Sequence, residues 1–269
     1  MVAEGDIDTL LDDIYRIHGY DFLNYSRSSL IRRINRIYGM DKFPSFAELR
    51  YKVQTDPEYV VKFVQELTVN VTEMFRDPHF YHSLRNNVIP YLASKPFIRI
   101  WHAGCSTGEE VFSVAILLKE AGLLHKSLIY GTDINAKVLE NIKKGVFPIN
   151  HLKQYSENYI ASGGKEDFSN YYTANYGQAK FKEELSKKII ISTHNLVSDG
   201  SFNEFDLILC RNVLIYFNKE LQDCVLNLLD NSLASLGYLA LGSKETLKFS
   251  VIAPQYRQLN SEKIWRKAT

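Results

Sequence analysis

The chain has 269 residues, of which 45% are hydrophobic and 23% are charged, and its formal net charge at pH 7 is +1. This balance is typical of a soluble globular protein with a sizeable core, and it argues against a dedicated nucleic-acid binder, which would carry a strong basic excess. No apolar run reaches the ~20 residues of a membrane span, and the three cysteines form no C-x-x-C pair, so we expect a cytoplasmic protein with reduced thiols.

The first 67 residues carry the pattern of a small all-helical domain. Apolar side chains recur with the 3.6-residue helical period in four runs, which begin at Ile7, Leu30, Phe46 and Val60. Residues that cap or break helices separate these runs, namely Gly19, Ser26, Gly39, Pro44, Ser45, Asp56 and Pro57. We therefore predict four helices and an N-terminal domain at residues 1–67.

The second of these helices has a basic side. Arg32, Arg33 and Arg36 fall within about 100° of arc opposite the apolar stripe, given about 100° of rotation per residue. No acidic residue occurs from Phe22 to Met40. The basic side is either a solvated helix face or a docking surface for an acidic partner, and both interpretations remain open at this point.

Residues 68–96 connect this domain to the rest of the chain. The stretch 68–78 leaves the helical period, is rich in β-branched residues and contains Arg76, so it is too apolar for a plain linker. A further helix is predicted at 81–92. Two histidines in this region stand three residues apart, but no third ligand of a suitable type lies nearby, so we expect no metal site.

The next stretch predicts a strand, a tight turn and a helix. Residues 97–103 are mostly apolar, Gly104 and Gly108 frame the turn, and the helix opens with Glu109 and Glu110. In open α/β sheets this unit binds nucleotide-like ligands at the carboxyl end of the strand. The turn has neither the lysine of a P-loop nor a G-x-G-x-x-G pattern. Acids are favourable at any helix N-terminus, but here they also suit a cationic nucleoside better than a polyphosphate, and S-adenosylmethionine is such a nucleoside.

A second strand is predicted at residues 128–133, with Asp133 at its end. An acid that follows the glycine motif in a dinucleotide-binding fold holds ribose hydroxyls. The same residue could instead only cap the helix that starts near Asn135. We favour ribose binding, with which a capping role is compatible.

The remainder of the chain predicts further strands and one insertion. An irregular, aromatic-rich region is interpreted as an inserted antiparallel β-subdomain at about residues 166–188. Strands are predicted at 189–193, 205–210 and 238–242, a helix at 219–236 ended by Gly237, and a closing hairpin at 256–259 and 263–266. This alternation predicts an α/β fold with a doubly wound, Rossmann-like methyltransferase sheet, mostly parallel with an antiparallel edge.

The carboxyl ends of parallel strands meet at one crevice, which would bring four groups of residues around a single ligand. These are the turn from Gly104 to Glu110, Asp133, Asn195 with Leu196, and Cys210 with Arg211 and Asn212. Asn195 and Leu196 suit the edge and face of an adenine, and Glu110 suits the positive end of the ligand. Tyr216 lies a few residues beyond a strand end, where its hydroxyl would project toward the reacting group.

The motifs that combine in this way are Asn70-x-Thr72-x-x-x-Arg76, Gly104-Cys-Ser-Thr-Gly-Glu-Glu110, Asp133, Asn195-Leu196 and Cys210-Arg-Asn-Val-x-Ile-Tyr-Phe217. Together they resemble the CheR family, the S-adenosylmethionine-dependent chemoreceptor glutamate methyltransferases of bacterial chemotaxis. The resemblance covers nearly the whole chain. The chain departs from the family at Val111-Phe112, where Pro-Tyr is usual, and at Gly242-Ser-Lys-Glu245, where Gly-His-Ser-Glu is usual.

The resemblance implies an enzyme, a protein-glutamate O-methyltransferase, with S-adenosylmethionine as cofactor, S-adenosylhomocysteine as product and no metal. It implies cofactor contacts at Asn70, Thr72, Arg76, Glu110, Asp133, Asn195, Leu196, Cys210 and Arg211. It also implies that Arg76 and Tyr216 lie beside the transferred methyl. The pattern at the strand ends adds Gly104 and Asn212 to the cofactor site.

The same resemblance implies partners. The helix with Arg32, Arg33 and Arg36 would dock the acidic helical methylation region of chemoreceptors, and the β-subdomain would bind a receptor's C-terminal tail peptide, as in some family members. We expect a monomer without a nucleic-acid partner or membrane insertion, in which residues 97–269 form the methyltransferase domain. The alternatives are a cofactor-binding module without catalysis and a methyltransferase for small molecules.

Overall fold

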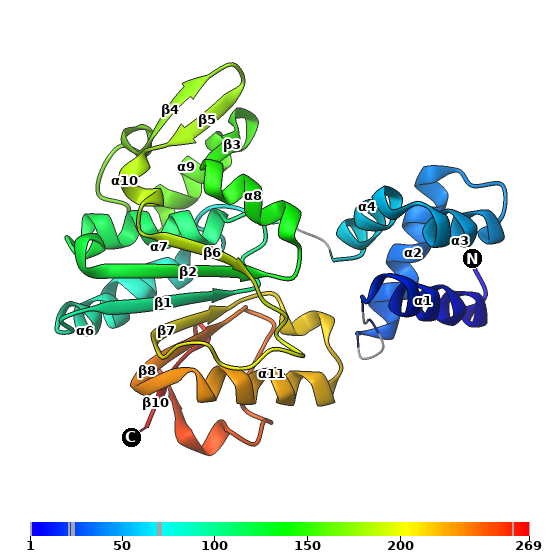
Figure 1. The fold of residues 1–269 in the computed structure, drawn as a ribbon. Coiled ribbons are helices and arrows are strands. Elements are labelled where there is room, and N and C mark those ends of the chain that lie inside the picture. The colour runs from blue at the N-terminus through cyan, green and yellow to red at the C-terminus, as the bar shows by residue number, and fades with distance from the viewer. Residues whose placement is uncertain (1, 21, 23–24, 69–71, 260, 269) are drawn as a thin grey trace. The chain divides into compact units, whose positions relative to one another are not determined.

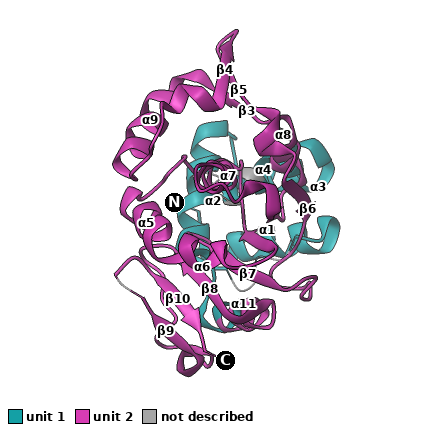
Figure 2. Cartoon of the chain, turned by 90° about the vertical axis from the view of Figure 1, so that its left-hand side faces the viewer, with its two compact units in different colours: residues 1–70, 215–222 teal, residues 71–214, 223–269 magenta. Residues whose placement is uncertain are grey.

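The computed structural model describes residues 2–20, 22, 25–68, 72–259 and 261–268, and the chain forms two compact units (Figures 1 and 2). The first unit contains Met1–Asn70 together with Ile215–Gln222, and the second contains Val71–Leu214 and Asp223–Thr269. A short segment from the C-terminal half of the chain therefore completes the N-terminal unit, which the sequence pattern did not predict.

The first unit is all-helical, as predicted. Its helices are α1 (Glu4–His18), α2 (Arg27–Asp41), α3 (Phe46–Thr55) and α4 (Pro57–Thr68). The apolar stripes that define these helices in the sequence meet in one core, which includes Ile7, Ile34, Leu49 and Phe63. Local signals set the ends of the helices: Gly19, at φ +77°, ends α1, and the Ser45 side chain accepts a hydrogen bond from the Glu48 amide at the start of α3.

The second unit is built on a seven-stranded sheet with the order β6-β2-β1-β7-β8-β10-β9. Its parallel part consists of β1 (Ile98–Ala103), β2 (Ser127–Asp133), β6 (Ile189–Thr193), β7 (Phe205–Cys210) and β8 (Leu233–Leu241). The terminal hairpin of β9 (Tyr256–Gln258) and β10 (Ile264–Lys267) adds the antiparallel edge. The predicted fold class is confirmed. Because β2 and β7 lie on opposite sides of β1, the carboxyl end of β1 is a topological switch point, where such sheets bind ligands.

Alternation along the strands gives the sheet two apolar faces. Ile100 and Leu209 face a core that contains α7 (Glu109–Glu120) and the helical run 78–93. This run consists of α5 (Pro78–Ser83), one turn of π-helix (Leu84–Val88) and α6 (Ile89–Ala93). On the opposite face, Trp101 packs against Phe205 with ring centroids 5.3 Å apart. Two-sided burial explains why these strands are nearly continuous hydrophobic runs.

The inserted subdomain is a three-stranded antiparallel sheet with the order β3-β5-β4 (Figure 1). Its strands are β3 (Val146–Pro148), β4 (Tyr172–Asn175) and β5 (Gln178–Phe181), so one strand precedes the predicted range of 166–188. Helices α8 (Ala136–Lys144), α9 (Leu152–Ala161) and α10 (Glu183–Ser186) flank these strands along the chain. Phe112 of α7 contacts Phe147 and Phe181, at centroid distances of 5.3 and 5.5 Å. The Phe that departs from the family pattern is thus a packing residue between α7 and this sheet.

One predicted helix is shorter than expected. The helix α11 (Lys219–Asn231) ends five residues before Leu236, and β8 begins at Leu233. The Ser232 side chain donates back to the Leu228 carbonyl, while the Ser232 carbonyl accepts from the Phe205 amide and starts the pairing with β7. The apolar residues after Asn231 suit a buried strand as well as a helix, so periodicity alone did not separate the two. Within the described ranges, no helix is long and apolar enough to cross a bilayer.

The turn after β1 yields a prediction about stability. Gly108 has a φ of +93°, and a Cβ there would lie 2.7 Å from Ile142 Cγ1. We expect Gly108→Ala to lower the free energy of unfolding by about 2–4 kcal/mol, from backbone strain and overpacking together. Gly122→Ala, at φ +71° with no atom within 4 Å of its Cβ, is the matched control and should cost about 1–2 kcal/mol. Urea denaturation measures both values, and equal losses would show that Ile142 gives way without cost.

Candidate functional site

The turn between β1 and α7 is held by the end of β2. The amides of Gly104 and Cys105 both donate to the Thr132 carbonyl, each at 2.9 Å. The amide of Ser106, which has a φ of +50°, donates to Asp133 Oδ2 at 2.9 Å. Gly104 needs its own φ of +79°, and a Cβ there would lie 2.6 Å from Val213 Cγ2. The predicted glycine turn is therefore held by three hydrogen bonds from its backbone amides, two to the Thr132 carbonyl and one to the Asp133 carboxylate.

Asp133 is a structural acceptor with spare capacity. Its Oδ1 accepts from the Asn135 amide at 3.0 Å, so each carboxylate oxygen receives one backbone N–H. A carboxylate has about four acceptor positions, which leaves room for ribose hydroxyls. The N-cap of α8 is Asn135, whose side chain accepts from the Lys137 amide at 3.1 Å, and not Asp133. Burial raises the pKa of Asp133, although its backbone hydrogen bonds act in the opposite direction.

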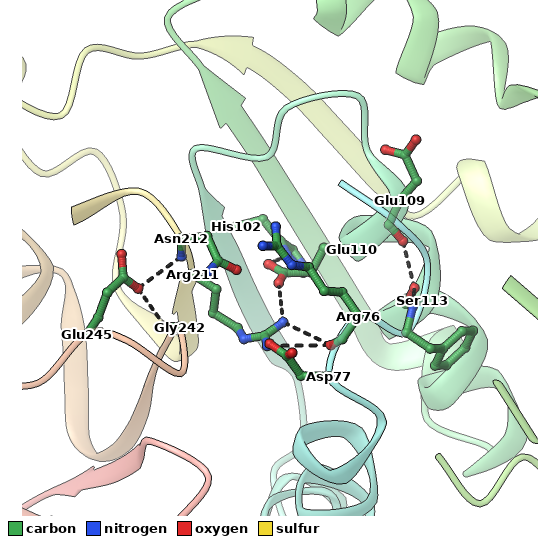
Figure 3. Close-up of polar contacts among 11 residues, drawn as sticks. Arg76, Asp77, His102, Glu109, Glu110, Ser113, Arg211, Asn212, Gly242 and Glu245 are labelled. Atoms are coloured by element: carbon green, nitrogen blue, oxygen red, sulfur yellow. Dashed lines mark hydrogen bonds and ion pairs between the residues drawn. The ribbon is translucent and has the colours of Figure 1, made fainter. Parts of the chain in front are cut away.

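The two acids at the start of α7 point to different neighbours. Neighbouring residues in a helix are rotated by about 100°, so only one of them faces the strand ends. Glu109 accepts hydrogen bonds from the hydroxyls of Thr107 at 2.6 Å and Tyr155 at 3.2 Å. Burial raises the pKa of Glu109, against the effect of these hydrogen bonds. Glu109 is therefore a packing residue beside α9, outside the strand-end cluster (Figure 3).

Glu110 lies between a histidine and an arginine at the carboxyl end of β1. His102 Nδ1–H donates to Glu110 Oε1 at 2.9 Å, and the Arg211 guanidinium lies 3.0 Å from Glu110 Oε2. Burial acts to raise the pKa of Glu110, but the His102 hydrogen bond and the charge of Arg211 outweigh it and lower this pKa. Glu110 is therefore an anion at neutral pH.

Arg211 joins three segments of the second unit. Only 2% of its side chain is exposed, and its second terminal nitrogen lies 2.7 Å from Asp77 Oδ2. Both terminal nitrogens lie 3.5 Å from the Arg76 carbonyl oxygen, and the guanidinium stacks on Phe80 at 3.9 Å from the ring centroid. Figure 3 shows Arg76, Asp77 and Glu110 gathered around this group. Arg211 thus fixes the backbone of the 76–77 segment against the end of β7.

The floor of the strand-end cluster is anchored by Glu245. Its Oε2 accepts hydrogen bonds from the Asn212 amide, at 2.9 Å, and from the Gly242 amide (Figure 3). A Cβ at Gly242 would lie 2.7 Å from Glu245 Oε2 and 2.8 Å from the Asn212 nitrogen. The carboxyl ends of β7 and β8 are therefore tied together by one buried carboxylate. The departure from the family pattern in this segment leaves Glu245 in place.

Three more of the predicted cofactor residues lie in the loop after β6 and at the end of β7. Asn195 and Leu196 follow β6, and the preceding His194 amide donates to the Asp133 carbonyl at 3.2 Å, so this loop lies beside the end of β2. Asn195 Oδ1 accepts from the Val197 amide at 3.0 Å, and Leu196 is buried. The Cys210 side chain is fully buried, and burial raises its pKa, so any ligand contact there would use the backbone.

Of the two predicted cofactor residues before α5, Thr72 is half-buried, whereas Asn70 lies outside the described residues. Tyr216 belongs to the first unit. Arg33 was predicted to lie on an exposed basic face of α2, and this is wrong: it is only 8% exposed. Helical periodicity predicted it on the side opposite the apolar stripe, but its contacts with the Leu67 carbonyl and the Tyr216 ring bury it.

Sequence reasoning missed His102, Asp77 and Glu245 as parts of this cluster. A polar residue inside the apolar run of β1 was the available signal for His102. Glu245 lies in the Gly242-Ser-Lys-Glu245 segment, but nothing in that segment indicates that its carboxylate binds backbone amides. Asp77 had no signal, because its partner Arg211 lies far away in the sequence.

The cluster fits a cationic nucleoside and suits a polyphosphate poorly. It offers two carboxylates, Glu110 and Asp133, at the switch point of the sheet. Its buried cation, Arg211, is engaged by Glu110 and Asp77. Among the residues that the structure describes, no group of three or more His, Cys, Asp and Glu side chains is arranged to hold a metal ion.

Comparison with known proteins adds independent findings. Residues 5–68 match the family described as "CheR methyltransferase, all-alpha domain", and residues 70–263 match "CheR methyltransferase, SAM binding domain". The Pseudomonas putida protein "Putative methyltransferase Cher3" is 44% identical over 266 residues, which are 98% of this chain and 97% of that protein. "Chemotaxis protein methyltransferase 2" of Pseudomonas aeruginosa is 32% identical over 244 residues, 89% of this chain and 86% of that protein.

The opposite pKa directions of the two adjacent acids yield a pH prediction. The pKa of Glu110 is lower in the folded protein than in the unfolded chain. Its ion pair therefore stabilises the fold at pH values above the unfolded pKa. This stabilisation is lost as the pH falls through the folded pKa. At pH 7, Glu110→Gln should cost about 3–5 kcal/mol, because Arg211 loses a charged partner. This difference from the wild type should shrink below about pH 4.

Glu109→Gln is the matched control, because the raised pKa of Glu109 reverses the sign. A buried carboxyl with a raised pKa contributes stability when it is protonated and loses that contribution as the pH rises. We therefore expect this variant to stay within about 1 kcal/mol of the wild type at pH 7. Urea denaturation from pH 3 to pH 8 checks both variants, and a pH-independent loss in Glu110→Gln would contradict the assignment.

Proposed function

The chain belongs to the CheR methyltransferase family, and we propose that it transfers a methyl group from S-adenosylmethionine to glutamate side chains of chemoreceptors, giving methyl esters. The observation that carries the proposal is the ionised Glu110, held by His102 and Arg211 at the switch point of the sheet. The names of two relatives, "Chemotaxis protein methyltransferase" in Borreliella burgdorferi and "Chemotaxis protein methyltransferase 2" in Pseudomonas aeruginosa, support the substrate class.

In this proposal Glu110 binds the cofactor's ammonium group and Asp133 binds its ribose hydroxyls. Both carboxylates keep acceptor positions beyond the hydrogen bonds that orient them. Asn195 and Leu196 border the adenine, and the backbone of Gly104, Cys210, Arg211 and Asn212 lines the floor. Asn70, Thr72 and Arg76 are assigned to the same site by the family pattern. When bound, the cofactor supplies an electrophilic methyl on a positively charged sulfur.

The residues of this chain need not act as a general base. A glutamate side chain has a pKa near 4.3 and is already ionised at neutral pH. Water opposes its reaction with a cation by solvating both ions, so positioning and exclusion of water are the main tasks of the protein. We assign the holding of the substrate carboxylate to Arg76, whose backbone is fixed by Arg211, and the orientation of the carboxylate to Tyr216.

Two surfaces are proposed for the receptor. Arg32 and Arg36 are the exposed basic residues of α2 and would meet its acidic helical region, although Arg36 already has a partner in Glu66 at 2.6 Å. The subdomain sheet of β3, β5 and β4 would hold a C-terminal tail peptide. Under this proposal residues 1–67 dock the substrate, residues 68–96 contribute to the cofactor site and residues 97–269 form the catalytic domain.

The direct test combines radiolabelled S-adenosylmethionine with cytoplasmic fragments of chemoreceptors. We expect base-labile methyl esters on glutamate residues, released as methanol, at a rate that saturates with the receptor fragment. Cofactor binding without ester on any fragment would favour a non-catalytic module. Methylation of small molecules, but not of receptors, would favour a small-molecule methyltransferase.

The role of Arg76 yields a prediction about rate. Arg76→Ala should lower methyl transfer by more than about 100-fold, because a charged hydrogen bond to the substrate carboxylate is lost. Cofactor affinity should change by less than about tenfold, since Glu110 and Asp133 remain. Calorimetry with S-adenosylhomocysteine and thermal unfolding separate loss of chemistry from loss of fold. Near-normal methyl transfer would remove Arg76 from the mechanism.

A further inference from the structure

Tyr216 is held by the N-terminal helical unit. It lies in a short 3₁₀ turn, Leu214–Tyr216, and its carbonyl accepts a hydrogen bond from the Ser26 amide at 2.7 Å, just before α2. The next residue, Phe217, forms an antiparallel bridge with Tyr25 and packs edge-on against its ring at 5.2 Å. Tyr25 and Ser26, the residues just before α2, therefore hold the backbone at Tyr216 and Phe217.

The side chain of Tyr216 has a cationic neighbour from α2. The Arg33 guanidinium carbon lies 4.6 Å from the centroid of the Tyr216 ring. The same guanidinium donates a hydrogen bond to the Leu67 carbonyl, in the last turn of α4. One buried side chain thus connects α2, the end of α4 and Tyr216, which all belong to the first unit.

Arg33 differs from the other two arginines of the basic cluster. Arg32 and Arg36 are exposed, and Arg36 pairs with Glu66. Arg33 is 8% exposed and has a carbonyl oxygen and an aromatic ring as neighbours. A guanidinium in such surroundings is poorly placed to meet a carboxylate of a partner, but it is well placed to fix the plane of a tyrosine ring.

We propose that Arg33 is a positioning residue for Tyr216, and that it couples the receptor-docking helix α2 to the tyrosine that orients the reacting carboxylate. This inference rests on the proposed function, because it needs Tyr216 to act on the substrate. The exposed arginines stand on α2, and Tyr216 is contacted by Arg33 of the same helix and by Ser26 just before it. A receptor segment that docks on α2 is therefore held at a fixed position relative to Tyr216. Docking on this helix then also orients the reacting carboxylate.

The first experiment compares Arg33→Ala with Arg36→Ala in the receptor methylation assay. Arg33→Ala should lower kcat by about 10- to 100-fold, the loss expected for one buried stacking contact and one hydrogen bond to a charged group, and should change KM for the receptor fragment by less than about threefold. Arg36→Ala should instead raise KM with little change in kcat. Arg16→Ala, at an exposed arginine of α1, is the control for surface charge and should leave both parameters unchanged.

Arg33→Lys tests whether the planar group is needed. Lysine keeps the charge and a donor for the Leu67 carbonyl but cannot stack as a plane, so it should recover the fold fully and the rate only in part. Thermal unfolding and S-adenosylhomocysteine affinity are measured for every variant. If Arg33→Ala fails to fold, the lysine variant alone decides: full activity with Lys would overturn the need for a planar stack on Tyr216.

A double-mutant cycle with Tyr216→Phe isolates the coupling. If Arg33 acts through the tyrosine hydroxyl, adding Arg33→Ala to Tyr216→Phe should cost less than about threefold in kcat. Amide hydrogen exchange of peptides that cover Ser26 and residues 214–218 gives a readout without activity, and it should rise in Arg33→Ala but not in Arg36→Ala. A raised KM with unchanged exchange would assign Arg33 to docking and overturn the proposal. Absence of methyl ester with the wild type would contradict the proposed function itself.

Discussion

A buried positive charge is the constraint on which the second unit depends. The Arg211 guanidinium cannot remain in the interior without anionic or π-electron partners, because the desolvation of an unpaired ion costs several kcal/mol. Its partners come from α7, from the segment before α5 and from α5 itself: Glu110, Asp77 and Phe80. The contacts of the Arg211 guanidinium therefore hold the start of α7, the Arg76 carbonyl and the end of β7 in one arrangement. The proposed ligand contacts are consequences of this arrangement.

The first residues of α7 separate structural from functional acids. Glu109 and Glu110 are neighbours in sequence, yet one is buried beside Tyr155 and has a raised pKa, while the other faces Arg211 and has a lowered pKa. The opposite directions follow from the helical rotation between them and from what each side chain meets. A pair of acids at a helix start is thus an ambiguous signal until the tertiary partners are known.

Sequence reasoning was most successful where the signal is local or periodic. The helices of the first unit, the parallel strands and the glycine turn follow from caps, breakers and hydrophobic period. It was less successful where partners are distant in the chain. Arg33 satisfies the helical period of an exposed face and yet is buried by Leu67 and Tyr216. The Asp77–Arg211 pair spans 134 positions, and no local pattern encodes such a pairing. The prediction of where α11 ends was wrong for a third reason: the apolar residues before Gly237 suit a strand as well as a helix.

The return of Ile215–Gln222 to the N-terminal unit has a consequence for synthesis of the chain. Helices α1 to α4 leave the ribosome early, but the partner of the Tyr25 ring, Phe217, follows only after most of the second unit has been made. The contacts among these helices are local in sequence, whereas the contacts with Ile215–Gln222 have high sequence separation and carry a large loop-closure entropy. Completion of the N-terminal unit is therefore a late step of folding. The first unit cannot assemble the surroundings of Tyr216 in a chain whose synthesis stops before that turn.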